Sequence, residues 1–262
     1  MSNKAIYHTE ILENRQMTDG IYDMWISCDA ARNAMPGQFA AVYTDNPTTL
    51  LPRPLSICEI DAAGGRLRIV YRVAGVGTRQ LSLMERGRNL RVLAPLGNGF
   101  NVSDKYGTIG IVGGGIGVPP LLELAKQTRQ RFPDTKITAC LGFRDAANVI
   151  LEDDFAKYAD AVYVSTDDGS YGTHGNTTTM LDTSDMQHDV TYGCGPKPML
   201  ASLSKWSAEN NTACYVSLEE RMACCIGACL ACVVKIKQNG AVAQEKICSA
   251  GPVFDAKELI WS

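Results

Sequence analysis

The spacing of apolar and polar positions changes character twice along the chain and divides it into three parts. In the first part, residues 67–73 alternate apolar and polar side chains and are rich in β-branched residues, which predicts a strand. Pro and Gly recur between residues 36 and 99, a rhythm typical of an antiparallel barrel. One helix is predicted, with Thr78 as its N-cap and Gly87 at its end. We therefore expect residues 1–102 to form an antiparallel β-barrel.

In the second part, short apolar runs alternate with longer amphipathic segments. The predicted strands are 108–112, 137–142, 161–165 and 190–193, and the predicted helices are 121–132, 149–158 and 198–209. Strands that alternate with helices indicate a parallel sheet with helices on its faces, so we expect an α/β domain over residues 103–211. The third part, residues 212–262, is rich in cysteine and loop-like, and we expect it to form a small separate domain.

Composition places the chain among ordinary globular proteins. It has 262 residues, of which 45% are hydrophobic and 20% charged, with a net charge of −3 and a pI of about 5.7. Such a charge offers no broad basic surface for nucleic acid or anionic membrane. No segment reaches the roughly 18 consecutive apolar residues of a membrane span. Residues 1–15 lack the apolar core of a signal peptide, so we expect a cytoplasmic protein.

Cysteines crowd the end of the chain. Cys224, Cys225, Cys229, Cys232 and Cys248 all lie in the third part. In a reducing compartment, clustered cysteines indicate metal or redox chemistry. Four residues separate Cys224 from Cys229, two separate Cys229 from Cys232, and Cys248 follows further on. This is the plant-type spacing for a [2Fe–2S] cluster. The small, uncharged residues between these cysteines let the backbone wrap closely and donate N–H groups to the sulfurs.

Two other interpretations of the cysteines remain open. Structural zinc also takes four cysteines, although usually as two short Cys-x2-4-Cys pairs. A disulfide framework requires an oxidising compartment. Within the cluster interpretation, spacing favours Cys224 over Cys225 as the first ligand, because Cys225 leaves only three residues before Cys229. Cys225 is then either an inert small residue or an alternative ligand.

Three short motifs in the first part suit a flavin nucleotide. Arg53, Pro54, Leu55 and Ser56 combine a guanidinium fork that matches a pyrophosphate with a hydroxyl that can hydrogen-bond a flavin ring. The residues Val70, Tyr71 and Arg72 add an aromatic ring that can stack and a second cation. Gly77 and Thr78 open the predicted helix, where glycine allows close approach to a phosphate and a helix start favours anions. For the first motif, a surface turn with a solvated arginine is the alternative.

The second part carries weaker nucleotide signals. Gly113, Gly114 and Gly115 follow a predicted strand and precede a predicted helix, but Val118 occupies the third glycine position of a dinucleotide fingerprint. A tight packing turn is the alternative. A pair of acidic residues, Asp167 and Asp168, can bond a ribose and repel a 2′-phosphate, which favours NAD over NADP, or they are simply turn residues.

Together these motifs resemble a known family. The Arg-Pro-Leu-Ser and Tyr-Arg-Val motifs, with residues 94–100, resemble the FAD domain of the ferredoxin–NADP reductase superfamily. One branch, the electron-transfer subunit of NAD-dependent dihydroorotate dehydrogenase, is resembled more closely, and the resemblance spans about residues 5–255. The segments that carry it are 113–120, 167–172, 194–196 and 220–224.

The resemblance implies cofactors and their residues. It implies FAD on the barrel, a pyridine nucleotide on the α/β domain with Cys194 facing the nicotinamide, and a [2Fe–2S] cluster near the C-terminus. For Cys194, a buried and inert cysteine is the alternative. The implied FAD residues are Arg53, Pro54, Leu55, Ser56, Val70, Tyr71, Arg72, Gly77 and Thr78. The implied cluster ligands are Cys224, Cys229, Cys232 and Cys248. The family loop usually has glycine where this chain has Cys225.

The resemblance also implies a function. Electrons pass between NAD(H), FAD and the cluster, and from there to or from the FMN of a partner catalytic subunit, which oxidises dihydroorotate to orotate in pyrimidine biosynthesis. Two subunits of each kind form the complex, with the cluster at the partner interface. The chain shows no nucleophile–histidine–carboxylate pattern, which fits a protein that only positions its cofactors.

Three alternative functions remain open from sequence alone. The first is a subunit of an electron-bifurcating or ferredoxin:NAD(P)H oxidoreductase, which shares FAD and cluster but has another partner. The second is a non-catalytic interaction module that holds zinc. The third is a stand-alone reductase that serves an oxygenase.

Overall fold

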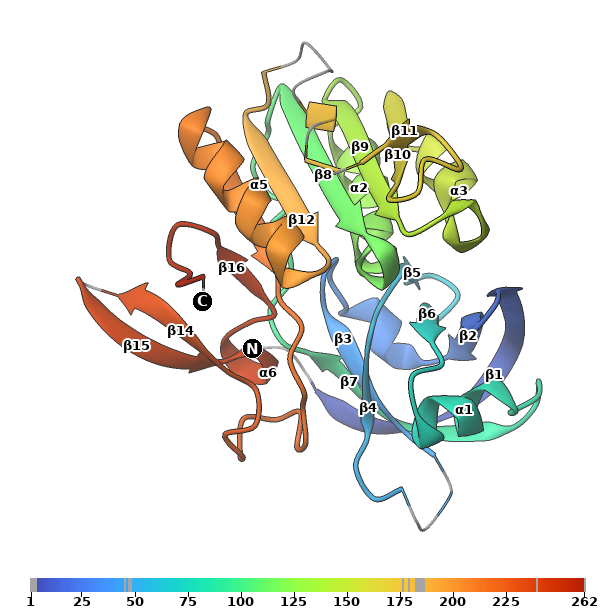
Figure 1. Ribbon diagram of the computed structural model, residues 1–262. Helices are drawn as coiled ribbons and strands as arrows, with labels where there is room; N and C mark the ends of the chain where they lie inside the picture. Colours follow the sequence, from blue (N-terminus) through green and yellow to red (C-terminus); the bar gives the residue numbers. More distant parts are fainter. Residues whose placement is uncertain are drawn as a thin grey trace.

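The computed structural model describes residues 4–44, 46, 49–175, 177–178, 180–181, 187–238 and 240–261. These residues form two seven-stranded sheets, one below the other in Figure 1, with a two-stranded hairpin at their side. The two sheets confirm the expected combination of an antiparallel barrel and a parallel-sheet domain.

None of the described helices is both long enough and apolar enough to cross a membrane.

The first sheet is a strongly curved antiparallel half-barrel with strand order β4-β3-β7-β1-β2-β6-β5. The strand predicted over 67–73 is β6, and its alternate residues Leu67, Ile69 and Tyr71 pack inside the barrel. The strands are β1 (Ala5–Thr18), β2 (Ile21–Ser27), β3 (Phe39–Tyr43), β4 (Arg53–Ser56), β5 (Glu59–Asp61), β6 (Arg66–Arg72) and β7 (Asn89–Leu96). A 3-10 turn η1 (Asp29–Arg32) also belongs to this half.

The helix predicted in the barrel begins earlier and is shorter than expected. Helix α1 spans Val76–Ser82, with Gly75 as its N-cap. Thr78 is therefore not the N-cap but the third helical residue. Its hydroxyl oxygen accepts hydrogen bonds from the backbone N–H groups of Ala74 (2.9 Å) and Gly75 (3.1 Å). A threonine that reaches back in this way closes the turn before the helix, which the local sequence alone did not distinguish from a cap.

The second sheet has the order β11-β10-β9-β8-β12-β13-β16 and is parallel except for β16. The four predicted strands and three predicted helices all occur. The strands are β8 (Thr108–Gly114), β9 (Lys136–Phe143), β10 (Ala161–Thr166), β11 (Thr173–His174), β12 (Val190–Cys194), β13 (Ala213–Ser217) and β16 (Val253–Asp255). The helices are α2 (Pro119–Arg131), α3 (Glu152–Ala156) and α5 (Lys197–Glu209), with 3-10 turns η2 (Gly115–Gly117) and η3 (Ala146–Asn148).

Helices cover both faces of the second sheet, and its strands end toward the barrel. Leu121 of α2 packs in one core with Ile111, whereas Leu200 of α5 packs in another with the neighbouring Val112. Since adjacent residues of a strand point to opposite faces, α2 and α5 lie on opposite sides. Figure 1 shows the carboxyl ends of β8 and β12 pointing down at the barrel. This edge is where parallel sheets usually bind ligands.

The third part is more ordered than the loop-like segment that the sequence indicated. It contains a hairpin of β14 (Val233–Gln238) and β15 (Ala241–Lys246) and the short helix α6 (Ile247–Ala250). Strands β13 and β16 belong instead to the second sheet, where Ser217 is paired with Val253. We therefore propose that the nucleotide unit extends through Ser217, and that residues 218–252 form the cluster segment.

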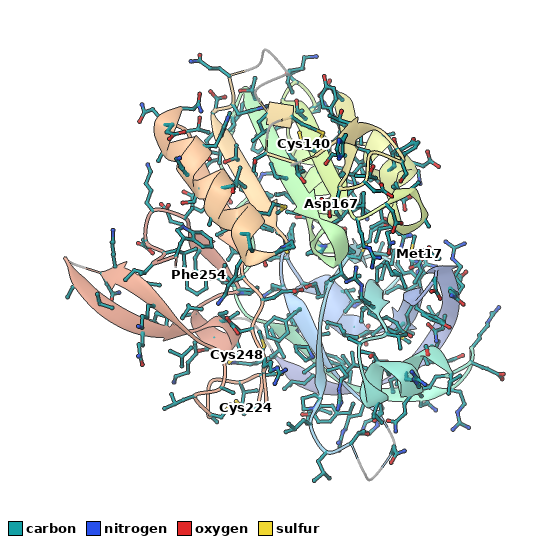
Figure 2. The ribbon with its side chains drawn as sticks, viewed as in Figure 1. Met17, Cys140, Asp167, Cys224, Cys248 and Phe254 are labelled. Carbon is teal, nitrogen blue, oxygen red and sulfur yellow. The ribbon has the colours of Figure 1, made fainter. Side chains whose placement is uncertain are left out.

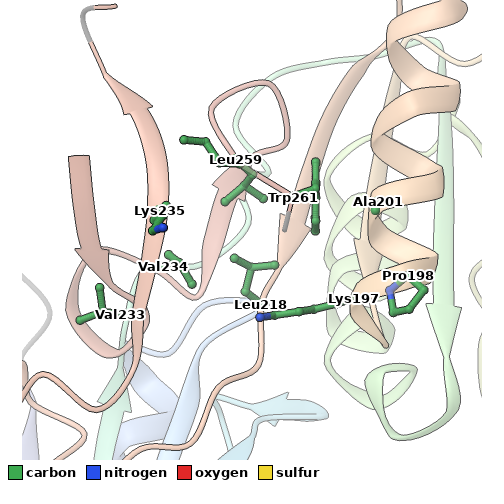
Figure 3. A pocket seen from close by; sticks show the side chains of 10 residues that line it. Lys197, Pro198, Ala201, Leu218, Val233, Val234, Lys235, Leu259 and Trp261 are labelled. Atoms are coloured by element: carbon green, nitrogen blue, oxygen red, sulfur yellow. The ribbon is translucent and has the colours of Figure 1, made fainter. Parts of the chain in front are cut away.

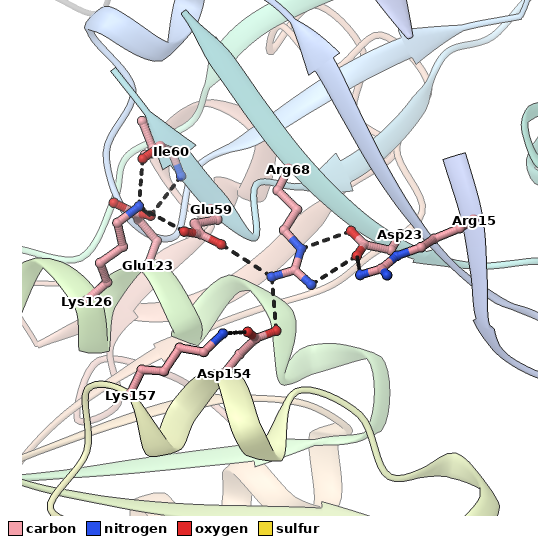
Figure 4. Close-up of polar contacts among 9 residues, drawn as sticks. All are labelled: Arg15, Asp23, Glu59, Ile60, Arg68, Glu123, Lys126, Asp154 and Lys157. Atoms are coloured by element: carbon pink, nitrogen blue, oxygen red, sulfur yellow. Dashed lines mark hydrogen bonds and ion pairs between the residues drawn. The ribbon is translucent and has the colours of Figure 1, made fainter. Parts of the chain in front are cut away.

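A buried ionic network joins the barrel to the second domain (Figure 4). The guanidinium of Arg68, on β6, donates to both carboxylate oxygens of Asp23 at 2.9 and 3.0 Å. It also donates to Asp154 of α3 at 3.0 Å. The side chain of Arg68 is only 7% exposed and that of Asp23 only 1%. A second bridge runs from Lys126 of α2 to Glu59 of β5 at 3.0 Å. The two domains are thus held together by charges that little water reaches.

Replacement of Arg68 by Met tests this network. It leaves the Asp23 carboxylate buried with only Arg15, whose side chain is 60% exposed, as a partner. Removing one member of a buried pair strands the other charge, so we expect a loss of about 3 kcal/mol in the free energy of unfolding. Urea denaturation followed by circular dichroism measures this loss as a lower midpoint at unchanged slope.

The matched control is Arg66→Met, two residues earlier on the same strand. Arg66 pairs with Asp61 at 2.5 Å, but its side chain is 52% exposed. We expect that variant to lose at most about 1 kcal/mol. Equal losses in the two variants would contradict a special role for Arg68.

Candidate functional site

The barrel has an open seam between β4 and β6. The two strands lie next to each other but are not paired in the part of the chain that the structure describes. Strand β5 pairs with β6 only over Arg66–Arg68, so residues 69–72 keep an unpaired edge. Backbone N–H and C=O groups on such edges are available to a ligand. The residues predicted to bind FAD at 53–56 and 70–72 therefore meet along one seam.

Arg53 and Gly77 form one unit at this seam. The Arg53 guanidinium donates to the carbonyl oxygen of Leu51 at 3.0 Å and lies directly against Gly77. A Cβ atom at position 77 would be 2.4 Å from the Arg53 Cζ atom, so only glycine leaves the guanidinium where it is. This is a cradle of the kind that a pyrophosphate requires. Thr78 supports it indirectly, because its hydroxyl is engaged with the turn before α1.

Tyr71 does not offer the stacking ring that the sequence suggested. Its side chain is 1% exposed, its ring stacks on Tyr22 at 5.8 Å, and its hydroxyl donates to Asn14 at 3.1 Å. Alternation along β6 directs this ring into the barrel. Val70 is likewise buried, whereas Arg72 is exposed at the strand end. A ligand at the seam would therefore meet Val70 and Tyr71 at their backbone and Arg72 at its side chain.

A pocket of about 310 Å³ lies where the seam meets the second sheet. Pro54 and Ser56 of β4 form one wall, and the chain that follows β13 forms another. The lining is Phe39, Pro54, Ser56, Ser217, Leu218, Glu219, Glu220, Arg221, Met222 and Pro252. The serine predicted to contact a flavin ring therefore faces a cavity.

The edge of the second sheet places three polar side chains near this pocket. Cys194 and Ser217 are register partners at the ends of β12 and β13. Burial, with the nearby Glu219 carboxylate, raises the pKa of Cys194, so its thiol is neutral at pH 7. Desolvation also raises the pKa of Glu219, while the Arg72 cation opposes the shift. Arg72 of the barrel and Cys194 of the second sheet thus share Glu219 as a neighbour.

Sequence reasoning missed Glu219. It belongs to no motif, and its neighbours come from strands far away in sequence, so no local signal identifies it. Its side chain is exposed, although neighbouring groups desolvate it enough to shift its pKa. That combination is typical of a residue on the wall of a cleft.

The three predicted glycines have different roles. A Cβ on Gly113 would be 2.8 Å from Val118, and one on Gly114 would be 2.7 Å from the sulfur of Met199. These two glycines are explained by close packing, which was the alternative interpretation. Gly115 has a φ of +53°, and a Cβ there would be 3.7 Å from Arg72. Among the three, Gly115 is the one directed at the barrel.

The two aspartates predicted to select the nucleotide follow β10. The carboxylate of Asp168 accepts hydrogen bonds from the hydroxyl and N–H of Ser170, at 2.6 and 2.9 Å, which lower its pKa. It is thereby engaged in its own turn. Asp167 is exposed, and Figure 2 shows it at the edge of the second sheet that faces the barrel. Asp167 is the better placed of the two to meet a ribose.

The four predicted cluster cysteines come together in two pairs. The thiols of Cys224 and Cys229 are within hydrogen-bonding distance of each other, as are those of Cys232 and Cys248. Figure 2 shows Cys224 and Cys248 on the same side of the molecule. Among the described residues, no three His, Cys, Asp or Glu side chains are grouped around one metal position. Two pairs suit a cluster with two thiolates on each iron better than a single zinc ion.

Backbone N–H groups already point at these sulfurs. The N–H of Gly227 donates to Cys248 Sγ at 3.1 Å, and that of Cys229 to Cys224 Sγ at 3.3 Å. Burial raises the pKa of Cys224, but the N–H groups around it outweigh burial and bring that pKa down to about 6. The donor set is therefore that of a thiolate-ligated cluster, in which such hydrogen bonds tune the potential. All ten cysteines are free thiols, which does not favour a disulfide framework.

Cys225 lies inside the cluster loop. It is fully buried and has a φ of +60°, a conformation that favours glycine. Burial, and then the surrounding thiols, raise its pKa to about 12, which keeps it protonated. A buried, neutral thiol is consistent with the inert role.

A second cavity of about 480 Å³ lies between the start of α5, β14 and the C-terminal residues (Figure 3). Lys197, Leu218 and Trp261 are among its lining residues. None of the residues predicted to bind a cofactor lines it. It adjoins the seam pocket at Leu218, which lines both cavities.

Replacement of Gly77 by Ala tests the seam. The added methyl group displaces the Arg53 guanidinium, so we expect FAD affinity to fall at least about tenfold, the equivalent of one charge-assisted hydrogen bond. Flavin absorbance after gel filtration measures retention. The control is Gly75→Ala, where a Cβ meets nothing within 4 Å. Equal FAD retention in both variants would count against Arg53 as a phosphate ligand.

Two cysteine variants test the cluster. Cys248→Ser removes a ligand, so we expect iron to fall far below about two atoms per chain. Cys225→Ala leaves the four ligands in place and should keep its iron. Iron analysis together with the visible spectrum reads both results. Iron loss in Cys225→Ala with retention in Cys248→Ser would reassign the ligands.

The chain is similar to known proteins in both sequence and structure. A family model described as the iron-sulfur cluster binding domain of dihydroorotate dehydrogenase B matches residues 219–260. The dihydroorotate dehydrogenase B (NAD(+)) electron transfer subunit of Bacillus caldolyticus is 41% identical over 254 residues, covering 95% of this chain and 96% of that protein. The protein of the same name from Streptococcus pneumoniae (strain ATCC BAA-334 / TIGR4) is 38% identical, covering 94% of this chain and 97% of that protein.

Solved structures agree with these relatives. The NADH-dependent reduced ferredoxin-NADP oxidoreductase, described in a study of flavin-based electron bifurcation, superimposes with a TM-score of 0.86 at 29% identity, covering 97% of this chain and 90% of that one. A cytochrome P450 reductase from Amycolatopsis superimposes with a TM-score of 0.66 at 18% identity, covering 80% of this chain and 67% of that one, and shows likeness of fold alone. From the sequence relatives, the chain belongs to the family of electron transfer subunits of dihydroorotate dehydrogenase B (NAD(+)).

Proposed function

We propose that this chain carries electrons between NAD(H) and the FMN of a partner catalytic subunit that oxidises dihydroorotate to orotate in pyrimidine biosynthesis. FAD lies along the β4–β6 seam, and a [2Fe–2S] cluster is held by Cys224, Cys229, Cys232 and Cys248. The flavin supplies the change from two-electron hydride chemistry to the single-electron chemistry of the cluster.

The observation that carries this proposal is the path of residues 217–224. Ser217 ends β13 beside Cys194, residues 217–222 line the pocket at the seam, and Cys224 follows two residues later. One short stretch of chain therefore runs from the flavin pocket to the first cluster ligand. Since electron tunnelling falls off steeply with distance, such a short connection is what an electron-transfer subunit requires.

The chain's own residues bind and orient the reactants. Arg53 and Arg72 supply the cations for a pyrophosphate at the seam. Cys194, buried and neutral, gives the nicotinamide an apolar surface without a competing charge. Glu219 closes the pocket from the linker side. At the far end, the exposed Asp167 repels a 2′-phosphate and thereby favours NAD over NADP.

The proposed partner covers the cluster loop. Ile226 and Leu230, within that loop, are 48% and 75% exposed. Large apolar side chains next to a redox centre suit a surface that another subunit shields from water. We propose that the FMN-containing subunit docks here, in a complex of two subunits of each kind in the cytoplasm.

A second candidate function has its own support. The structural likeness at a TM-score of 0.86 is to an NADH-dependent reduced ferredoxin-NADP oxidoreductase. A chain with that role would pair with a different large subunit. Reduction of ferredoxin, without any dihydroorotate-dependent reduction of NAD⁺ by the purified complex, would favour it.

An anaerobic absorbance spectrum before and after addition of NADH tests the proposal. We expect flavin and [2Fe–2S] bands that bleach with NADH, at about two irons per FAD. Because hydride enters at the flavin, bleaching of both chromophores shows that the two centres are connected. A folded chain that holds zinc, without flavin or iron, would overturn the proposal and leave the interaction module.

A further inference from the structure

Among the described lysines and arginines, Lys246 alone has a side chain that hydrogen-bonds the backbone of the cluster loop, residues 224–232. Its Nζ atom donates to the carbonyl oxygen of Gly227 at 3.0 Å. The N–H of the same glycine donates to Cys248 Sγ at 3.1 Å. Lys246 itself stands two residues before Cys248. Lys246 thus links the segment that carries Cys248 to Gly227, whose N–H donates to the sulfur of Cys248.

The backbone around Lys246 is fixed independently of its side chain. Lys246 is the register partner of Val233 at the end of the β14–β15 hairpin. The next residue, Ile247, donates its N–H to the carbonyl oxygen of Cys232 at 2.9 Å. The hairpin end therefore sets the distance between Cys232 and Cys248. The Lys246 side chain adds the remaining connection, from this pair of ligands to the loop at Gly227.

The charge of Lys246 is not neutralised locally. No ion pair between Lys246 and a carboxylate occurs within the described ranges, and its side chain is half-buried. Addition of one electron to the cluster converts one ferric ion to ferrous and adds one negative charge, with no proton or bond transferred. A cation nearby attracts that added charge, and partial burial weakens solvent screening of the attraction. The reduced form is then favoured.

We propose that Lys246 is a positioning residue that holds the cluster loop closed on Cys248 and raises the reduction potential of the cluster. The proposal rests on the function proposed above, which supplies the cluster and, in the reduced FMN of the partner, its electron donor. Removal of the charge makes the cluster a poorer acceptor, so electrons remain longer on the FMN of the partner.

Redox titration of the purified chain tests the proposal, with mediators and dithionite in place of NADH. The cluster signal is followed by electron paramagnetic resonance. In Lys246→Gln we expect the ratio of reduced to oxidised cluster at a fixed potential to fall three- to tenfold, about 30–60 mV for a one-electron couple. Lys246→Arg, which retains the charge and the donor, should lie within about twofold of the unaltered protein.

The matched control is Lys237→Gln. Lys237 is exposed on β14 of the same hairpin, so that variant changes net charge equally without touching the loop. An unchanged potential in Lys246→Gln with full iron would overturn the proposal, as would an equal shift in Lys237→Gln. Iron loss from Lys246→Gln but not from Lys246→Arg supports the closing role, whereas iron loss from both overturns it.

The proposal for Lys246 and the proposed function can be disproved independently of each other. Chemical titration needs neither NADH nor the partner subunit, so it reports on Lys246 alone. The proposed function fails when the unaltered protein lacks flavin or iron. The proposal for Lys246 fails when the unaltered protein contains flavin and iron but has the same cluster potential as Lys246→Gln.

Discussion

The buried guanidinium of Arg68 is the constraint on which the arrangement of the site depends. It binds Asp23 within the barrel and Asp154 on α3 of the other domain, and little water competes for either contact. Buried ion pairs add little net stability, but they penalise any arrangement in which one partner is left alone. The network therefore acts mainly on geometry. With the barrel and the second sheet held in place, the open seam faces the strand ends of the second sheet at a fixed distance. Hydride transfer and electron transfer both require a fixed distance between the reacting groups.

Much of the fold follows from local patterns. The strands and helices between residues 108 and 209 repeat a simple alternation, and all of them except the two-residue strand β11 and the 3-10 turns were predicted. The four cluster cysteines were equally accessible to sequence reasoning, because a ligand set built on one tight loop leaves a fixed spacing. Motifs 53–56 and 70–72 also proved to share one seam. In each case the signal lies within a few residues, which is why the sequence alone carries it.

The remainder depends on contacts between distant segments. The sequence alone grouped β13 with the cysteine-rich part, and only its pairing with β12 and β16 joins it to the second sheet. Alternation predicts that the Tyr71 side chain lies on the same face of its strand as Leu67 and Ile69, but not that this face lines the barrel interior. Glu219 and Lys246 have no motif, and their importance comes from neighbours such as Arg72 and Gly227. Residues of this kind become visible only when the chain is folded.

The neck of the cluster segment has a further consequence. Ser217 and Val253 are paired on adjacent strands, and the N–H of Leu218 donates to the carbonyl oxygen of Pro252 at 2.9 Å. The chain thus leaves and re-enters the second sheet at a single point. A segment whose two ends coincide behaves as an inserted cassette, which evolution can add to or remove from a flavin reductase without breaking its sheet. Outside the neck, the Asn98 side chain of the barrel donates to the carbonyl oxygen of Ala250, and the N–H of Lys237 donates to that of Glu258. These contacts prevent the cassette from swinging on the neck, so electrons cross a fixed distance.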